Sequence, residues 1–122
     1  MTKPYLLVLF DSRHGHVAKM ARLIADGCEQ AGLEARLRMV PNGNDMPDFP
    51  LVSLEDLQHC AGLALGSPVR FGQMTAAMKA FWEQSSGIWL RGQLIDKPGA
   101  VFTSSSSLHG GQEACLLGLM VP

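Results

Sequence analysis

Three loops of small polar residues stand out in this sequence, because each comes within two residues of the end of a short apolar run. The loops are residues 12–16, 67–73 and 104–112, which follow the apolar runs 5–10, 62–66 and 99–102. If these runs are parallel strands, their carboxyl ends meet at one edge of a sheet, where open α/β folds bind their ligands. We therefore expect the three loops to build one ligand site.

The first loop, Ser12-Arg-His-Gly-His16, has the composition of a short phosphate-binding loop. Helical periodicity begins at Val17, so the positive helix end and its free backbone N–H groups would face the ligand. Gly15 would allow close backbone approach, and the Ser12 hydroxyl would donate a hydrogen bond. Further positive or polar contacts would come from Arg13, His14 and His16. The loop is neither G-x-G-x-x-G nor a Walker A sequence, which disfavours a Rossmann or P-loop nucleotide site. A plain turn between strand and helix remains the alternative.

The second and third loops could enclose a flat ring with polar edges. Such a ligand needs apolar side chains against its faces and hydrogen-bonding groups along its rim. Phe71 and Trp89 could supply the faces, and the Ser/Gly segments, including Ser104–Ser107, could supply the rim.

The elements that position these loops follow from hydrophobic periodicity. Strands are predicted over 5–10, 35–39, 62–66 and 99–102, and helices over 17–31, 54–60, 75–85 and 113–119, with a loop over 41–52. This alternation predicts one domain, a parallel sheet with right-handed crossovers, and helices on both faces. Polar and apolar residues alternate over 35–39, which predicts an edge strand, whereas 99–102 is apolar on both faces, which favours a central one.

Composition excludes several classes of protein. The formal net charge is −1, so no basic surplus exists to bind nucleic acid or an anionic membrane. The N-terminal apolar run is too short for a signal peptide or a membrane span. The three cysteines, Cys28, Cys60 and Cys115, lack metal-ligand spacing and are typical of free thiols in the cytoplasm; we expect Cys28 and Cys115 to be buried.

Four motifs in order resemble the WrbA-type NAD(P)H:quinone oxidoreductases, which are flavodoxin-like FMN proteins. They are Ser12-Arg-His-Gly-His16, Gly66-Ser-Pro-Val-Arg-Phe-Gly-Gln-Met74, Gly87-Ile-Trp-Leu-Arg-Gly92 and Gly110-Gly-Gln-Glu113. The resemblance implies a three-layer, doubly wound α/β sheet of strand order 2-1-3-4, with residues 1–122 forming one FMN-binding domain. It also implies two-electron reduction of a quinone by NADH or NADPH.

The resemblance also implies residue roles. Cofactor contacts would come from Ser12, Arg13, His14, Gly15, His16, Val17, Val69, Arg70, Phe71, Gly72, Ser104, Ser105, Ser106, Ser107 and Gly110. His14 would lie near the nicotinamide, and Trp89 over the quinone. FMN would carry the redox chemistry, so we assign no catalytic side chain and no metal ligand.

Members of this family continue past the position of Pro122 with a fifth strand and a last helix. We therefore expect a fold that lacks these two elements, and a chain that associates into homodimers or homotetramers instead of remaining a stable monomer. The early end, together with Val69 where the family commonly has threonine and with the bulky Leu108, leaves an alternative. In that alternative, the chain is a non-catalytic electron carrier or an interaction module.

Overall fold

The computed structural model describes residues 3–43 and 49–122, and contains a four-stranded parallel sheet. The strands are β1 (Tyr5–Phe10), β2 (Glu34–Met39), β3 (Gly62–Pro68) and β4 (Gly99–Ser104), in the order β2-β1-β3-β4. Leu6 pairs with Ala35 on one side and with Gly62 on the other, and Leu63 pairs with Gly99. The predicted α/β class and the 2-1-3-4 order are confirmed. Residues 44–48 of the predicted loop 41–52 lie outside the described residues.

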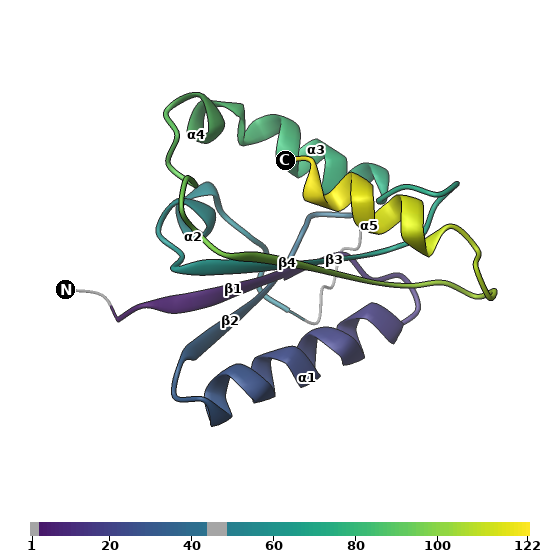
Figure 1. The fold of residues 1–122 in the computed structure, drawn as a ribbon, viewed down its shortest axis with the longest axis horizontal. Coiled ribbons are helices and arrows are strands. Elements are labelled where there is room, and N and C mark those ends of the chain that lie inside the picture. Colours follow the sequence, from purple (N-terminus) through teal and green to yellow (C-terminus); the bar gives the residue numbers. More distant parts are fainter. Residues whose placement is uncertain (1–2, 44–48) are drawn as a thin grey trace.

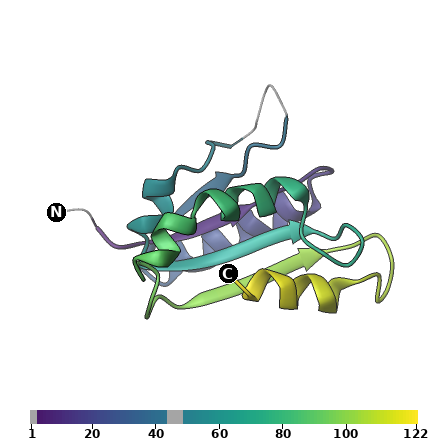
Figure 2. The same cartoon turned by 90° about the horizontal axis from the view of Figure 1, so that it is seen from above.

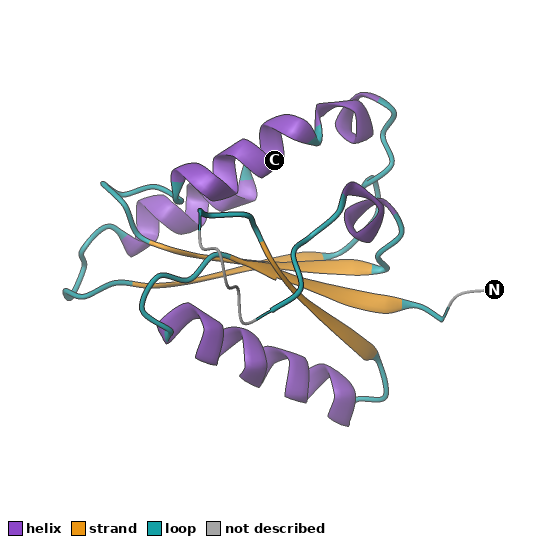
Figure 3. Ribbon diagram, turned by 180° about the vertical axis from the view of Figure 1, so that it is seen from behind, coloured by secondary structure: helices purple, strands orange, loops and turns teal. Residues whose placement is uncertain are grey.

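Helices cover both faces of the sheet. Helix α1 (His16–Gln30) lies alone on one face, and the helices of the other face are α2 (Leu54–Gln58), α3 (Ala76–Gln84), α4 (Ser86–Leu90) and α5 (Gln112–Met120) (Figures 1 and 3). The predicted three layers are therefore present. No helix in the described part of the chain is both long and apolar enough to span a bilayer.

The core on the α1 face is built from small helix residues against large strand residues. Val17, Ala21 and Ala25 are buried on α1, and they pack in one cluster with Val8 and Phe10 of β1. Small side chains at one-turn spacing let the helix approach the sheet closely. The prediction that Cys28 is buried was wrong. The buried residues of α1 are Val17, Ala21 and Ala25, which follow one another at intervals of four, and the Cys28 side chain lies beside this row and is partly exposed.

The core on the opposite face joins β1 and β3 to the four helices α2, α3, α4 and α5. Leu7 and Leu9 of β1 cluster with Met78 of α3, Ile88 of α4 and Leu119 of α5, all buried. Helix α4 is an addition to the predicted elements. It follows α3 directly through Ser85, whose buried side chain donates to the Trp82 carbonyl at 2.7 Å.

The sequence predicted the position of one outer strand, β2, but not the burial of the other, β4. Strand β2 lies at an edge, as its alternating pattern predicts. Strand β4 was expected to be buried on both faces, but among its apolar residues only Phe102 is buried, and Gly99 and Ala100 are exposed. The reason is that β4 is the outer strand on its side of the described sheet, so one of its neighbours is solvent.

All four strands point the same way, so their carboxyl ends share one edge. Figure 2 shows the arrowheads of β3 and β4 at the same end, where α5 begins. The loops after β1, β3 and β4 therefore meet there, as the sequence predicts.

Candidate functional site

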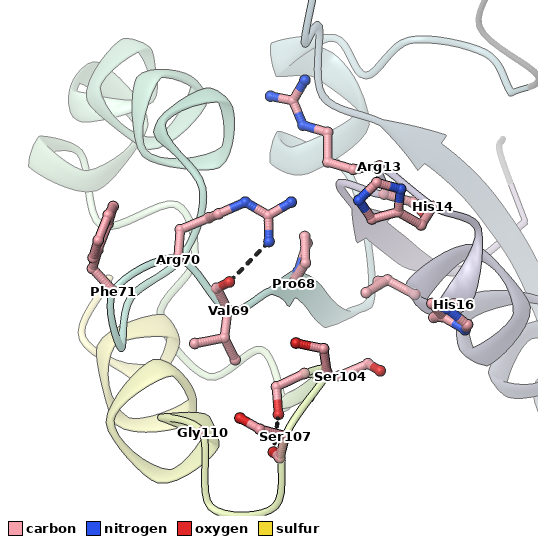
Figure 4. Close-up of a pocket in the computed structure, with 14 residues that line it drawn as sticks. Arg13, His14, His16, Pro68, Val69, Arg70, Phe71, Ser104, Ser107 and Gly110 are labelled. Carbon is pink, nitrogen blue, oxygen red and sulfur yellow. Dashed lines mark hydrogen bonds between the residues drawn. The ribbon is translucent and has the colours of Figure 1, made fainter.

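The three loops enclose a cavity of about 560 Å³ (Figure 4). Its lining contains every residue predicted for the cofactor except Gly15 and Gly72, and adds Pro68. The lining residues are Ser12, Arg13, His14, His16, Val17, Pro68, Val69, Arg70, Phe71, Ser104, Ser105, Ser106, Ser107 and Gly110. The volume falls within the range typical of small-molecule sites.

The first loop folds around the Ser12 hydroxyl. Ser12 Oγ accepts from the backbone N–H of Gly15 at 3.1 Å and from that of Ala18 at 3.4 Å, which closes the turn before α1. Gly15 caps α1 with a φ of 90°, a left-handed conformation that favours glycine. The first N–H groups of a helix have no partner within the helix, so those of His16 and Val17 are available to an anion.

A close contact between glycines joins the second and third loops. A Cβ on Gly111 would lie 2.9 Å from the Cα of Gly72, and Gly111 has a φ of 105°. Gly72 also has a positive φ of 75°. Although Gly72 does not line the cavity, its contact with Gly111 sets how closely Val69 and Arg70 approach Ser104–Ser107, which we call the serine loop.

The serine loop is held by its own hydrogen bonds. Ser105 Oγ donates to the Ser107 carbonyl at 2.8 Å, and Gln112 Nε2 donates to the same carbonyl at 3.1 Å. A Cβ on Gly110 would lie 2.2 Å from Ser107 Oγ and 3.0 Å from the Ser107 carbonyl oxygen, so a larger residue there would have to displace the Ser107 side chain. The exposed ring of His109 hydrogen-bonds to Glu113, which lowers the pKa of that carboxyl group.

The charge of the cavity wall is positive. Its ionisable residues are Arg13, His14, His16 and Arg70, and among residues 3–43 and 49–122 no aspartate or glutamate lines it. Guanidinium groups, serine hydroxyls and helix N–H groups together suit a phosphate. In Figure 4 the Arg70 side chain extends toward the Arg13 and His14 loop, and the serine loop lies on the opposite side.

Two of the predicted ring-contacting residues lie differently from what the sequence suggests. Phe71 lines the cavity, but its side chain is fully exposed and points outward in Figure 4, on a backbone with a φ of 52°. Trp89 does not reach the cavity. It is 66% exposed on α4, which lies at the end of the sheet where β1 begins (Figure 1).

Asp11 is a positioning residue that the loop analysis missed. It is fully buried beneath the first loop, where Oδ2 accepts from Thr75 Oγ1 at 2.6 Å and Oδ1 from Asn42 Nδ2 at 2.8 Å. Arg13 Nε lies 3.8 Å from the same carboxylate. Asp11 therefore ties the first loop to the start of α3. An acidic residue directly after a six-residue apolar strand was the signal in the sequence.

The sequence profile of the NADPH-dependent FMN reductase family matches residues 5–117. The chain belongs to this family. The match runs from β1 into α5 and so includes all three loops of the site.

Two curated relatives agree with this family assignment. The chain is 37% identical to the NAD(P)H dehydrogenase (quinone) of Gluconacetobacter diazotrophicus and to NAD(P)H dehydrogenase (quinone) 3 of Rhizobium meliloti, over 98% and 99% of its length. It spans 65% and 61% of those two proteins, which is less than two thirds of each.

The fold also matches solved flavodoxin-like structures. A WrbA-like protein from Agrobacterium tumefaciens superposes with a TM-score of 0.81 at 25% identity, over 98% of this chain and 71% of that one. An archaeal flavodoxin superposes with a TM-score of 0.58 at 16% identity, over 96% of this chain and 95% of that one, which supports the fold alone.

Proposed function

We propose that this chain is the FMN-binding domain of an NAD(P)H:quinone oxidoreductase, with FMN in the cavity of about 560 Å³. The observation that carries the proposal is the convergence of hydroxyl, helix N–H and cationic groups, with no carboxylate among the described lining residues. The family and the flavodoxin-like neighbours indicate FMN as the cofactor, with NAD(P)H as the electron donor.

The lining residues fit the two ends of FMN. The loop from Ser12 to Val17 would hold the phosphate, because its hydroxyl, N–H and guanidinium groups are those that bind a dianion. Val69 and Pro68 would give an apolar surface to the isoalloxazine ring, and the serine loop from Ser104 would hydrogen-bond to its rim. Gly15 and Gly72 contribute through backbone shape.

When bound, FMN supplies the redox chemistry of transfer from a nicotinamide to a quinone. The chain's own residues bind and orient the cofactor and shield one side of it, and none of them is required as an acid, base or nucleophile. A nicotinamide contact by His14 is compatible with its place in the cavity wall. A quinone contact by Trp89 stays a prediction, and it could come only from a second copy of the chain, given where Trp89 lies.

We also propose that the protein works as a homo-oligomer in the cytoplasm. Support for association comes from the exposed large apolar residues Trp89, Leu90 and Val121. Support for a reducing compartment comes from the three free cysteines.

A flavin titration tests the proposed function. Apo-protein is titrated with FMN, and the loaded protein is then mixed anaerobically with NADH or NADPH and afterwards with a benzoquinone. We expect saturable FMN uptake, bleaching of the flavin by the nicotinamide, and recovery of the colour with the quinone. FMN uptake without bleaching would instead identify an electron carrier, and no uptake at all would identify an interaction module.

A further inference from the structure

A second and larger cavity, of about 1030 Å³, lies next to the first. Four residues line both cavities, namely Arg13, His14, Arg70 and Phe71. The remaining wall comes from the segment leading into α3, the first turns of α3 and the end of α5. A ligand in the second cavity would therefore contact one in the first across these shared residues.

The second cavity is also positively charged. Arg13, Arg70 and Lys79 line it, and no carboxylate does so within the described ranges. Arg13 is partly engaged, since Nη1 donates to the Asn42 carbonyl at 3.2 Å and Nε lies 3.8 Å from Asp11. Arg70 Nη1 donates to the backbone carbonyl of its neighbour Val69 at 2.9 Å. This acceptor is neutral, so the contact does not neutralise the guanidinium charge.

Lys79 lines the second cavity and not the first. A substitution of Lys79 therefore tests binding in the second cavity without changing the wall of the first. It projects from α3 with an exposed side chain, and its Nζ lies 3.8 Å from Glu83 Oε1, one helical turn further on. Such an exposed pair is weak, so Lys79 can exchange Glu83 for a phosphate at little cost.

We propose that the second cavity binds the phosphates of the nicotinamide dinucleotide, and that Lys79 and Arg70 select NADPH over NADH. The inference rests on the proposed function, which puts FMN in the first cavity. A 2′-phosphate is a dianion that cationic side chains stabilise in any fold, whereas the free ribose hydroxyl of NADH can donate to a carboxylate, as it does in Rossmann sites. Among residues 3–43 and 49–122, the lining of the second cavity includes the cations and no carboxylate.

The test is calorimetric titration of the FMN-loaded protein with NADP⁺ and with NAD⁺, which bind without reducing the flavin. We expect NADP⁺ to bind at least fivefold more tightly. Lys79→Gln should weaken NADP⁺ binding by roughly three- to tenfold and change NAD⁺ binding by less than about twofold, as expected for loss of one partly solvated charge contact.

Two further variants sharpen the result. Glu83→Gln removes the competing carboxylate without touching the cavity wall, so NADP⁺ should bind more tightly than in the wild type. Lys19→Gln removes an exposed lysine from α1, on the opposite face of the sheet, and should leave both affinities unchanged.

The proposal is overturned if NADP⁺ and NAD⁺ bind equally, or if Lys79→Gln weakens both to the same extent. Failure of the proposed function would look different, because FMN would then not bind. In that case, adenosine 2′,5′-bisphosphate titrated into the flavin-free protein still tests the cavity, and its binding should weaken in Lys79→Gln and not in Lys19→Gln.

Discussion

Replacing Asp11 by alanine should destabilise the protein through the hydrogen bonds that join two of the site loops. Asp11 accepts from the hydroxyl of Thr75 and from the amide of Asn42, and it is fully buried. Leaving a buried donor without its acceptor costs about 1–3 kcal/mol. The Thr75 hydroxyl is buried and loses its acceptor outright, so we expect Asp11→Ala to lower the free energy of unfolding by about 2–3 kcal/mol.

Asp11→Asn keeps a hydrogen-bonding side chain at this position and so measures how much of the loss in Asp11→Ala comes from the missing hydrogen bonds. Its carbonyl oxygen can still accept from Asn42, and its amide can donate to Thr75 Oγ1 once that hydroxyl rotates. The loss should therefore be smaller, at about 1 kcal/mol. Asp26→Ala serves as the control, because Asp26 is exposed on α1 and should change stability by less than about 0.5 kcal/mol.

The assay is urea unfolding followed by circular dichroism, with a double-mutant cycle between positions 11 and 75. Thr75→Val alone removes both the hydroxyl donor to Asp11 and the N-cap acceptor for the Met78 N–H. Combined with Asp11→Ala, it removes both partners of one hydrogen bond, so the double variant should lose at least about 0.5 kcal/mol less than the sum of the single losses. Additive losses would refute the coupling of the first loop to α3.

Three other perturbations test the site and its support. Gly15→Ala meets no heavy atom within 4 Å but forces alanine to a φ of 90°, so we expect a loss of about 1–2 kcal/mol in thermal unfolding and weaker FMN binding by fluorescence titration. Gly66→Ala would put a Cβ 2.1 Å from the Phe102 ring, and should cost about 3 kcal/mol or more in urea unfolding, part of which Phe102→Leu in the same background should restore. With iodoacetamide at pH 8, mass spectrometry should find Cys28 alkylated first and Cys115 only after unfolding, because burial raises the pKa of the Cys115 thiol and keeps it protonated.

The sequence determined those features that depend on local pattern and on the geometry of parallel strands. Short continuous apolar runs predicted three of the strands, and the change of period at Val17 predicted α1. Because parallel strands end at one edge, the three loops had to converge, and nearly every residue expected to contact the cofactor lines the cavity between them. The positive φ of 90° at Gly15 agrees with the choice of a glycine there, and its predicted close approach to a ligand stays a prediction.

Tertiary structure decided which residues meet across the chain, and no local pattern encodes those pairings. Asp11 and Thr75 are 64 positions apart, and only the fold brings the start of α3 to the end of β1, where the two residues form a hydrogen bond. The burial of Ala25 and the partial exposure of Cys28 depend on how α1 packs on the sheet. The exposure of Gly99 and Ala100 depends on which strand lies outermost. Lys79 and Trp89 show the same effect. Lys79 lies in the first turns of α3, next to the loops, and the chain then runs to the far end of the sheet, which takes Trp89 away from them.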